Sequence, residues 1–393
     1  MASEMTSGDI FTPEQLLYHA KVYAGPGAGK THFLVENVKN IIANNPQIVQ
    51  SRARKVLCVT YTNAAVDEIK RRLDKFTDHV EVYTIHGFII KHIIQPFQQD
   101  LRDIIKSDFG ITMESKGVIS SQIEGVGILH GVDKEEIYDF VRRTNPVEFE
   151  NDEFEYSKKS MGDIEVNCKS FVKSISNGTD RKIELIAPRK IDERHVKSIK
   201  KYVWSVVKKL THNEILYFGY RILESNPTAA YSIRVKFPFM FVDEFQDTNP
   251  LQTLIVKLIG QKSTIIGIVG DVAQSIYSFQ GARPTDFKNF SIEGDRELKE
   301  YVINGNRRST ENIVNFCNFL RQSDDEVLQL SQRPYSTAGE KEQAEAKKIH
   351  FLIGNSQIVY NTIQNILNDG GVVLTRAWAA AFDYIQGIDE SQA

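Results

Sequence analysis

Residues 24–31 read Ala24-Gly25-Pro26-Gly27-Ala28-Gly29-Lys30-Thr31, and this stretch decides the fold. It follows a short apolar segment, Ala20–Ala24, and opens a segment whose apolar residues recur at helical spacing as far as Pro46. A glycine-rich turn between a strand and a helix presents successive backbone N–H groups to an anion. The pattern therefore predicts a loop that binds the phosphates of a nucleotide, rather than a glycine turn that binds nothing. We expect Lys30 to reach the β- and γ-phosphates and the Thr31 hydroxyl to bind Mg²⁺.

A phosphate loop of this kind needs an acidic residue at the end of a neighbouring strand. Residues 239–242 (FMFV) form an apolar run, and Asp243 and Glu244 follow it directly. We expect Asp243 to hold Mg²⁺ and Glu244 to act as the base that polarises the attacking water. Capping of the next helix is the alternative role for these two acids, and the phosphate loop favours the catalytic one.

Apolar runs alternate with helical patterns on both sides of these motifs. Residues 55–60 (KVLCVT) and 264–270 (TIIGIVG) read as buried strands, and residues 251–260 read as a helix. Alternating strands and helices predict an α/β fold with a parallel sheet and helices on both faces.

The domain organisation follows from shifts in composition. We expect one lobe formed by residues 1–107 and 214–298, a mostly helical insertion at 108–213, and a second, incomplete lobe at 299–393 with strands at 349–353 and 372–375. Residues 147–156 hold five acids and no base, whereas residues 181–209 are strongly basic. Charge alone leaves open whether the basic stretch binds nucleic acid or is a solvated helix surface.

The composition is that of an ordinary globular chain. It has 393 residues, of which 41% are hydrophobic and 25% charged, with a net charge of −3. No apolar run approaches the ~18 residues that span a bilayer, and the polar N-terminus does not resemble a signal peptide. The three cysteines form no CxxC pair, so we expect neither a disulfide framework nor a zinc cluster, and a cytoplasmic location without a membrane partner.

Five further motifs follow the phosphate loop. They are TYTNAAVDEI (Thr60–Ile69), TIHGF (Thr84–Phe88), VDEFQDTNPLQ (Val242–Gln252), VGDVAQSIYSFQGA (Val269–Ala282) and NRRST (Asn306–Thr310). With these motifs in this order, the chain resembles the UvrD/Rep-type superfamily 1 DNA helicases over most of residues 12–313. The resemblance implies a RecA-like P-loop NTPase fold with ATP and Mg²⁺ between two lobes. It also implies 3′ to 5′ movement on single-stranded or tailed duplex DNA. On this interpretation, we expect the basic part of the insertion, residues 181–209, to be an accessory DNA contact.

The resemblance assigns roles to residues at the nucleotide. Asp243, Glu244, Gln274 and Arg308 are expected to carry the catalysis, with Gln274 at the γ-phosphate and Arg308 as an arginine finger. The adenine would contact Gln15 and Arg307, and Arg307 replaces the tyrosine of the family pattern.

The resemblance also assigns a DNA-facing set. Thr60, Thr62 and Asn63 are expected to bind phosphates. The aromatic residues expected to stack on bases are His86, Phe88, Tyr277 and Phe279. Packing in the core is the alternative for each aromatic residue.

The C-terminal part departs from the family pattern. The later motifs of the second lobe are not visible, so the chain resembles a partial helicase. Arg376, in the sequence Leu374-Thr375-Arg376-Ala377, is either a second finger or part of a second-lobe strand. Two alternatives to a helicase remain: an ATP-sensing subunit that gates a nuclease or other protein partner, and a catalytically inactive DNA-binding module. Intact Lys30, Asp243 and Glu244 disfavour the inactive module.

Overall fold

The computed structural model describes residues 2–113, 117–119, 121–122, 172–174, 183–185, 201, 204–205, 208–210, 212–277, 282–321, 328–347, 349, 361–363 and 365–366. The chain divides into two compact units. One comprises Met1–Ser309 with Val314–Pro334, and the other comprises Thr310–Ile313 with Tyr335–Ala393. The larger unit contains the phosphate loop and all of the motifs except Thr310, the last residue of the final motif.

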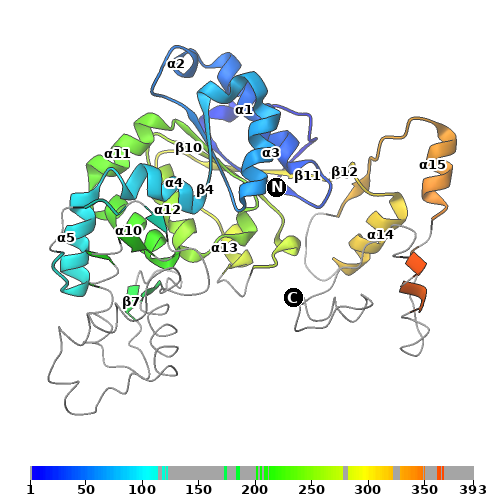
Figure 1. Ribbon diagram of the computed structural model, residues 1–393. Helices are drawn as coiled ribbons and strands as arrows, with labels where there is room; N and C mark the ends of the chain where they lie inside the picture. The colour runs from blue at the N-terminus through cyan, green and yellow to red at the C-terminus, as the bar shows by residue number, and fades with distance from the viewer. Residues whose placement is uncertain are drawn as a thin grey trace. The chain divides into compact units, whose positions relative to one another are not determined.

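A seven-stranded sheet is the centre of the larger unit (Figure 1). Its strand order is β1-β11-β2-β10-β9-β3-β4, and every neighbouring pair is parallel. The strands are β1 (Ser3–Met5), β2 (His19–Ala24), β3 (Val56–Thr60), β4 (Val80–Thr84), β9 (Phe239–Val242), β10 (Ile265–Gly270) and β11 (Leu298–Ile303). The predicted parallel α/β fold is confirmed.

Each face of the sheet has its own apolar core, because alternate side chains of a strand point to opposite faces. In β3, Leu57 and Val59 belong to one core, whereas Val56 and Cys58 belong to the other. The first core is completed by α4 (Ile85–Ile89), α5 (Gln98–Phe109), α10 (His212–Ser225), α11 (Pro227–Lys236) and α12 (Pro250–Gly260). The second core is completed by α1 (Lys30–Asn44) and α3 (Asn63–Leu73). Helices on both faces were predicted, and the two cores confirm this.

The boundary predicted at residue 298 is corrected by β11. This strand pairs with β2 along its whole length, from Leu298 opposite His19 to Ile303 opposite Ala24. Tyr301 and Ile303 are buried in the core that contains α1. The sheet of the first lobe therefore includes residues that we had assigned to the second.

The inserted segment is described only in part. It includes only the last two residues of α5, and its described residues form two small strand pairs that we did not predict: β5 (Ser121–Gln122) with β8 (Lys209–Leu210), and β6 (Val172–Ser174) with β7 (Ile183–Leu185). The acidic stretch 147–156, most of the basic stretch 181–209, the strand expected at 372–375 and Arg376 lie outside the described residues, as does nearly all of the strand expected at 349–353. Within the described ranges, none of the helices is both long and apolar enough to cross a membrane.

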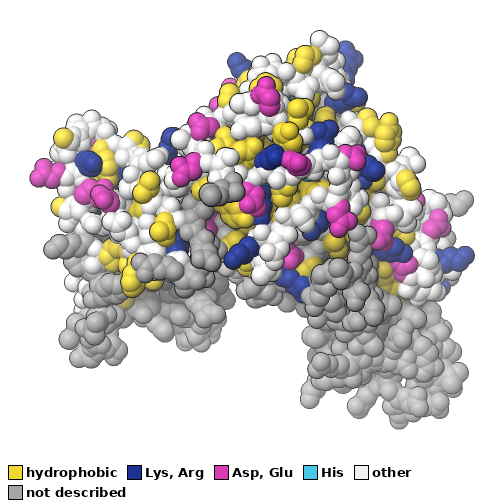
Figure 2. All heavy atoms as spheres, turned by 180° about the vertical axis from the view of Figure 1, so that it is seen from behind, with side chains coloured by type: hydrophobic (Ala, Val, Ile, Leu, Met, Phe, Trp, Pro, Cys, Tyr) yellow, Lys and Arg dark blue, Asp and Glu magenta, His cyan; other side chains and the backbone are white. Residues whose placement is uncertain are grey.

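Side chains of opposite charge are interspersed on the face drawn in Figure 2, with apolar side chains between them. This mixture agrees with the small net charge of −3. Among the described residues on this face, neither sign of charge forms one large continuous patch.

Candidate active site

The phosphate loop joins β2 to α1. Gly27 and Gly29 have φ angles of 70° and 85°, in the left-handed region that favours glycine. Gly29 precedes the first helical residue, Lys30, and no side chain caps this end of α1. The N–H groups at the start of the helix are therefore not used by a capping side chain, as an anion-binding helix end requires.

Two glycines of the loop are also needed because other side chains lie directly on them. A Cβ atom on Gly25 would be 2.3 Å from Nε2 of Gln329, and one on Gly27 would be 2.6 Å from Oδ1 of Asn306. Asn306 belongs to β12 (Gly305–Asn306), which pairs with β13 (Leu330–Ser331) next to Gln329. A larger residue at Gly25 would require the Gln329 side chain to move, whereas one at Gly27 would be strained by the positive φ and would press on Asn306.

Five predicted residues meet at the loop. The Nζ atom of Lys30 lies 3.0 Å from Oε2 of Glu244 and donates a hydrogen bond of 3.0 Å to Oε1 of Gln274. Thr31 Oγ1 donates to Oδ2 of Asp243 at 3.4 Å. The sheet order explains the meeting, because β2, β10 and β9 are neighbouring parallel strands whose carboxyl ends lie at one edge.

The two acidic residues of the site are unusual, Asp243 in its pKa and Glu244 in its backbone conformation. Asp243 is buried, and this burial, together with the charge of Glu244, raises its pKa to about 6. Glu244 has a φ of 52°, which is uncommon for a residue other than glycine and is typical of strained functional positions. A bound divalent cation would add to the positive charge of Lys30 and so favour the ionised form of Asp243.

A second layer of hydrogen bonds holds the predicted catalytic side chains in place. Gln246 donates to Oε2 of Glu244 at 2.9 Å and accepts from the backbone N–H of Asp271 at 3.0 Å. Asp271 accepts from Nε2 of Gln274 at 2.7 Å and forms a buried ion pair with Arg321. Glu244, Gln274 and Lys30 are thus parts of one network.

Sequence reasoning missed the positioning residues of this layer. Gln246 and Asp271 stand inside motifs that we quoted, but their side chains received no role. Arg321 lies just after α14 (Glu311–Leu320), beyond the last motif, and no local sequence signal marks it. Its partner Asp271 is 50 residues away in the chain, so only the fold reveals the pair.

The segment at Asn306 lies against the phosphate loop. Asn306 Nδ2 donates to the carbonyl oxygen of Pro26 at 2.7 Å, and the N–H of Arg307 donates to the carbonyl oxygen of Gly27 at 2.9 Å. The N–H of Arg308 donates to Oδ1 of Asn306 at 3.0 Å. The side chains of Arg307 and Arg308 are exposed. The structure thus brings both arginines next to the loop, and their roles toward a nucleotide stay predictions.

The prediction for Gln15 needs correction. Gln15 Oε1 accepts from the N–H of Thr12 at 2.8 Å, and Thr12 Oγ1 accepts from the N–H of Gln15 at 3.3 Å. This pair lies before the start of β2, whereas the phosphate loop follows its end. A six-residue strand is about 20 Å long. The side chain of Gln15 is therefore engaged in a local turn at the opposite edge of the sheet from the phosphate loop.

The predicted phosphate-binding residues of the DNA-facing set end or follow strand β3. Thr60 is buried, and its hydroxyl has no hydrogen-bond partner among the described residues. The Thr62 side chain accepts from the N–H of Ala65 at 3.2 Å and caps α3, and Asn63 is exposed in the first turn of that helix.

The aromatic residues of the set have different surroundings. The ring of Tyr277 stacks on that of Tyr61, with centroids 4.4 Å apart and planes at 32°. His86 is half-buried at the start of α4. The prediction for Phe88 is corrected, because its ring is fully buried and packs against His92 and Phe237 in the core.

Phe279 lies outside the described residues. Tyr61 was missed, although it stands inside the quoted motif at residues 60–69. Burial, together with the neighbouring Tyr277 and Asp247, raises the pKa of its hydroxyl to about 12. The aromatic pair of Tyr61 and Tyr277 lies beside the carboxyl ends of β3 and β10.

The architecture and this edge define a P-loop NTPase of the RecA-like class, and comparison with known proteins gives the family. Residues 12–294 match the UvrD/REP helicase N-terminal domain, and the chain belongs to this family of superfamily 1 helicases.

Three relatives illustrate the similarity. The chain is 29% identical over 339 residues to the Gabija protein GajB of Bacillus cereus, covering 78% of this chain and 47% of the relative. It is 27% identical over 334 residues to the ATP-dependent DNA helicase PcrA of Staphylococcus aureus, covering 81% and 40%. It is 26% identical over 310 residues to a probable DNA helicase II homolog of Mycoplasma capricolum, covering 76% and 38%. The matched region spans less than half the length of each relative.

We predict that Asp243→Asn stabilises the protein in the absence of nucleotide and Mg²⁺. The raised pKa of Asp243 means that the folded protein binds the proton more tightly than the unfolded chain, so stability falls as the pH rises from about 4 to about 6. The asparagine of the variant has no ionised form, so folding does not carry the free-energy cost of burying a carboxylate. Above pH 6 its free energy of unfolding should exceed that of the wild type by about 1–3 kcal/mol, measured by urea denaturation.

Asp67→Asn on the exposed side of α3 is the matched control and should not change the pH dependence. The difference between Asp243→Asn and the wild type should shrink below pH 4. A variant that is less stable than the wild type at pH 8 would contradict the assignment of a destabilising carboxylate at this position.

Proposed function

We propose that this chain is the motor part of an ATP-dependent DNA helicase or translocase of the UvrD/Rep type, which couples ATP hydrolysis to 3′ to 5′ movement on single-stranded DNA. The observation that carries the proposal is the position of the buried Lys30 ammonium, 3.0 Å from both Glu244 and Gln274. One cation thus contacts the expected base and the expected γ-phosphate sensor. When phosphate oxygens bind Lys30 in their place, Glu244 and Gln274 would both lose this contact and could move.

The nucleotide site follows from this geometry. The amides of the phosphate loop and Lys30 would bind the β- and γ-phosphates of ATP. Thr31 and Asp243 provide hard oxygen ligands, 3.4 Å apart, which suit Mg²⁺. When bound, Mg²⁺ supplies positive charge to the phosphates. Glu244, freed from Lys30, is held by Gln246 and would take a proton from the attacking water.

Gln274 provides the connection from the nucleotide to the DNA. Its carboxamide contacts Lys30 on one side and Asp271 on the other. Three residues later the chain reaches Tyr277, which stacks on Tyr61. A shift of Gln274 toward a γ-phosphate would therefore be transmitted to this aromatic pair through a short loop.

The remaining site residues complete the proposal. Arg308 would act as the arginine finger and Arg307 would stack on the adenine, and both side chains are exposed next to the phosphate loop. The partner is single-stranded or tailed duplex DNA. On the DNA-facing edge, the groups proposed to contact it are Thr60, Thr62, Asn63, His86, Tyr61 and Tyr277.

A second candidate is an ATP-sensing subunit that gates a nuclease or other protein partner without unwinding DNA. It is supported by the similarity to the Gabija protein GajB, a relative whose name, unlike that of PcrA, states no helicase activity. ATP hydrolysis measured with and without DNA, followed by a strand-displacement assay, separates the two candidates. DNA-stimulated hydrolysis without displacement would favour the second.

Two substitutions test the chemistry. Lys30→Ala should abolish hydrolysis and weaken nucleotide binding, because the phosphates lose the cation of the loop. Glu244→Gln should bind ATP but hydrolyse it at least ~100-fold more slowly, because an amide cannot accept the proton. Steady-state phosphate release and binding of a fluorescent ATP analogue measure the two effects. Wild-type turnover in Glu244→Gln would exclude Glu244 as the base.

The stacked tyrosines provide a separate test of DNA binding. If bases stack on this pair, Tyr277→Ala and Tyr61→Ala should each weaken the affinity for single-stranded DNA by ~1–3 kcal/mol, whatever the base sequence. Tyr231→Ala, which removes an exposed tyrosine from α11, is the matched control and should have no effect. Fluorescence anisotropy with homopolymeric oligonucleotides gives the affinities, and thermal unfolding verifies that each variant is folded. Unchanged affinity in both folded variants would refute stacking.

A further inference from the structure

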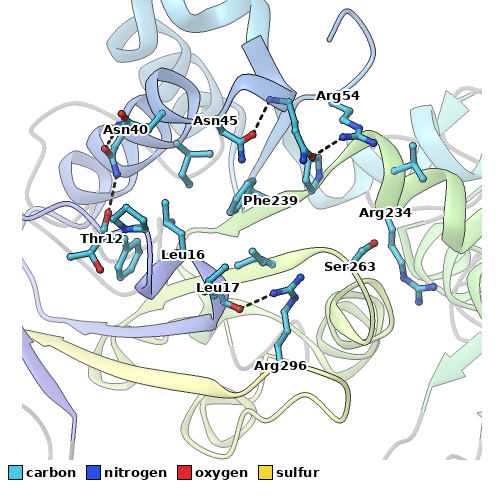
Figure 3. Close-up of a pocket in the computed structure, with 18 of the residues that line it drawn as sticks. Thr12, Leu16, Leu17, Asn40, Asn45, Arg54, Arg234, Phe239, Ser263 and Arg296 are labelled. Atoms are coloured by element: carbon cyan, nitrogen blue, oxygen red, sulfur yellow. Dashed lines mark hydrogen bonds between the residues drawn. The ribbon is translucent and has the colours of Figure 1, made fainter. Parts of the chain in front are cut away.

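A groove opens at the edge of the sheet opposite the phosphate loop (Figure 3). Its volume is about 1010 Å³. Phe239 and Ile265, which line it, are the first residues of β9 and β10, so the groove lies at the amino-terminal ends of these strands. It is therefore separate from the nucleotide site and from the DNA-facing residues, which lie at the carboxyl ends.

The walls of the groove include large apolar side chains that are exposed to solvent. Ile10, Leu17, Tyr231 and Val235 are between 40% and 66% exposed, and all four line the groove. They come from the N-terminal segment and from α11, which are far apart in sequence. Apolar side chains that gather in a hollow, rather than being scattered singly, are typical of a binding surface.

The charged side chains of the groove all have the same sign. Arg54, Arg234 and Arg296 line it, and the described residues that line it include no Asp or Glu. Each guanidinium donates to a neutral oxygen: Arg54 to the Gln47 side chain at 2.8 Å, Arg234 to the backbone of residue 258 at 2.6 Å, and Arg296 to the backbone of residue 17 at 2.8 Å (Figure 3 draws the bonds of Arg54 and Arg296).

These three positive charges are therefore not neutralised by the groove itself. Within the described part of the chain, none of the three arginines takes part in an ion pair. Burial lowers the pKa of Arg234, which is the effect expected of a cation without a nearby carboxylate. A carboxylate brought by a ligand would find charged donors here.

The basic character continues into an adjoining hollow of about 670 Å³, which shares Tyr231 and Val235 with the groove. Arg52, Lys55 and Lys236 line this hollow. Among the described residues that line it, the one acid is Glu81, whose carboxylate lies 2.7 Å from Nζ of Lys236 and 2.8 Å from Nε2 of His92. The two hollows together form one continuous surface, in which the apolar side chains of the groove lie next to basic side chains.

We propose that this surface binds an acidic segment of a partner protein, one that inserts apolar side chains between Tyr231 and Leu17 and places carboxylates next to Arg54 and Arg296. The charge complementarity identifies the partner as acidic. The apolar walls favour a peptide over a nucleic acid, because a peptide can bury apolar side chains against them, whereas a nucleic-acid backbone carries a charge at every phosphate. The proposal does not depend on the proposed helicase activity.

The probe is a short synthetic peptide in which glutamate alternates with leucine and phenylalanine, labelled for fluorescence anisotropy. It should bind the full chain, and the affinity should fall as salt is added. A peptide with lysine in place of each glutamate should not bind. Tyr231→Ala should weaken binding by roughly tenfold, and Arg54→Glu with Arg296→Glu by roughly tenfold or more.

Lys288→Glu, which reverses an exposed charge on α13 (Pro284–Lys288), is the matched control and should leave the peptide affinity unchanged. ATP hydrolysis by the groove variants should equal that of the wild type, which separates this proposal from the proposed function. Absence of peptide binding, or equal affinity in the groove variants, would overturn it. Displacement of the peptide by an oligonucleotide whose own binding is lost in Arg54→Glu with Arg296→Glu would instead assign the surface to nucleic acid.

Discussion

The buried ammonium of Lys30 is the group on which the arrangement of the active site depends. It is 8% exposed and requires counterparts, because an unpaired charge in the interior is costly. Glu244 and Gln274 are those counterparts, and they arrive from two different strands. Only a sheet in which β2, β10 and β9 are adjacent and parallel brings the three groups together at one edge. The order of the strands is thus a requirement of the chemistry as well as of the core.

The network around Lys30 extends beyond the motifs. Gln246 links the acidic loop after β9 to the loop after β10, and Asp271 links the latter to Arg321. A buried ion pair contributes little net stability when it is compared with apolar packing, whereas loss of one partner is strongly destabilising. The pair of Asp271 and Arg321 therefore serves better to hold the Gln274 carboxamide in one orientation than to stabilise the fold. In this way, the position of the segment after α14 influences a residue that contacts Lys30.

The two edges of the sheet have different chemistry. Polar groups lie at the carboxyl edge. Two of them are unusual: Glu244 has a strained backbone conformation, and burial destabilises the ionised form of Asp243. The amino-terminal edge carries apolar side chains bordered by arginines, and the described residues that line its groove include no Asp or Glu. Because the same strands end at both edges, a protein bound at one edge and a nucleotide at the other would contact opposite ends of β9 and β10. The fold therefore offers two surfaces that can be occupied at the same time.

The sequence by itself determined the local parts of this protein. A glycine-rich loop between a strand and a helix is visible as a sequence pattern because its cause is local, and so is an acidic pair after an apolar run. From these patterns we could predict the parallel α/β fold and the site residues Lys30, Thr31, Asp243 and Glu244. Side-chain contacts between distant segments were decided only by the tertiary structure. Phe88 and Tyr277 look alike as aromatic residues next to a strand end, yet one is core and the other stacks on Tyr61. Likewise, β11 pairs with β2 in the first sheet, and Arg321 forms an ion pair with Asp271. Both contacts join segments far apart in the chain, so no local sequence pattern predicts them.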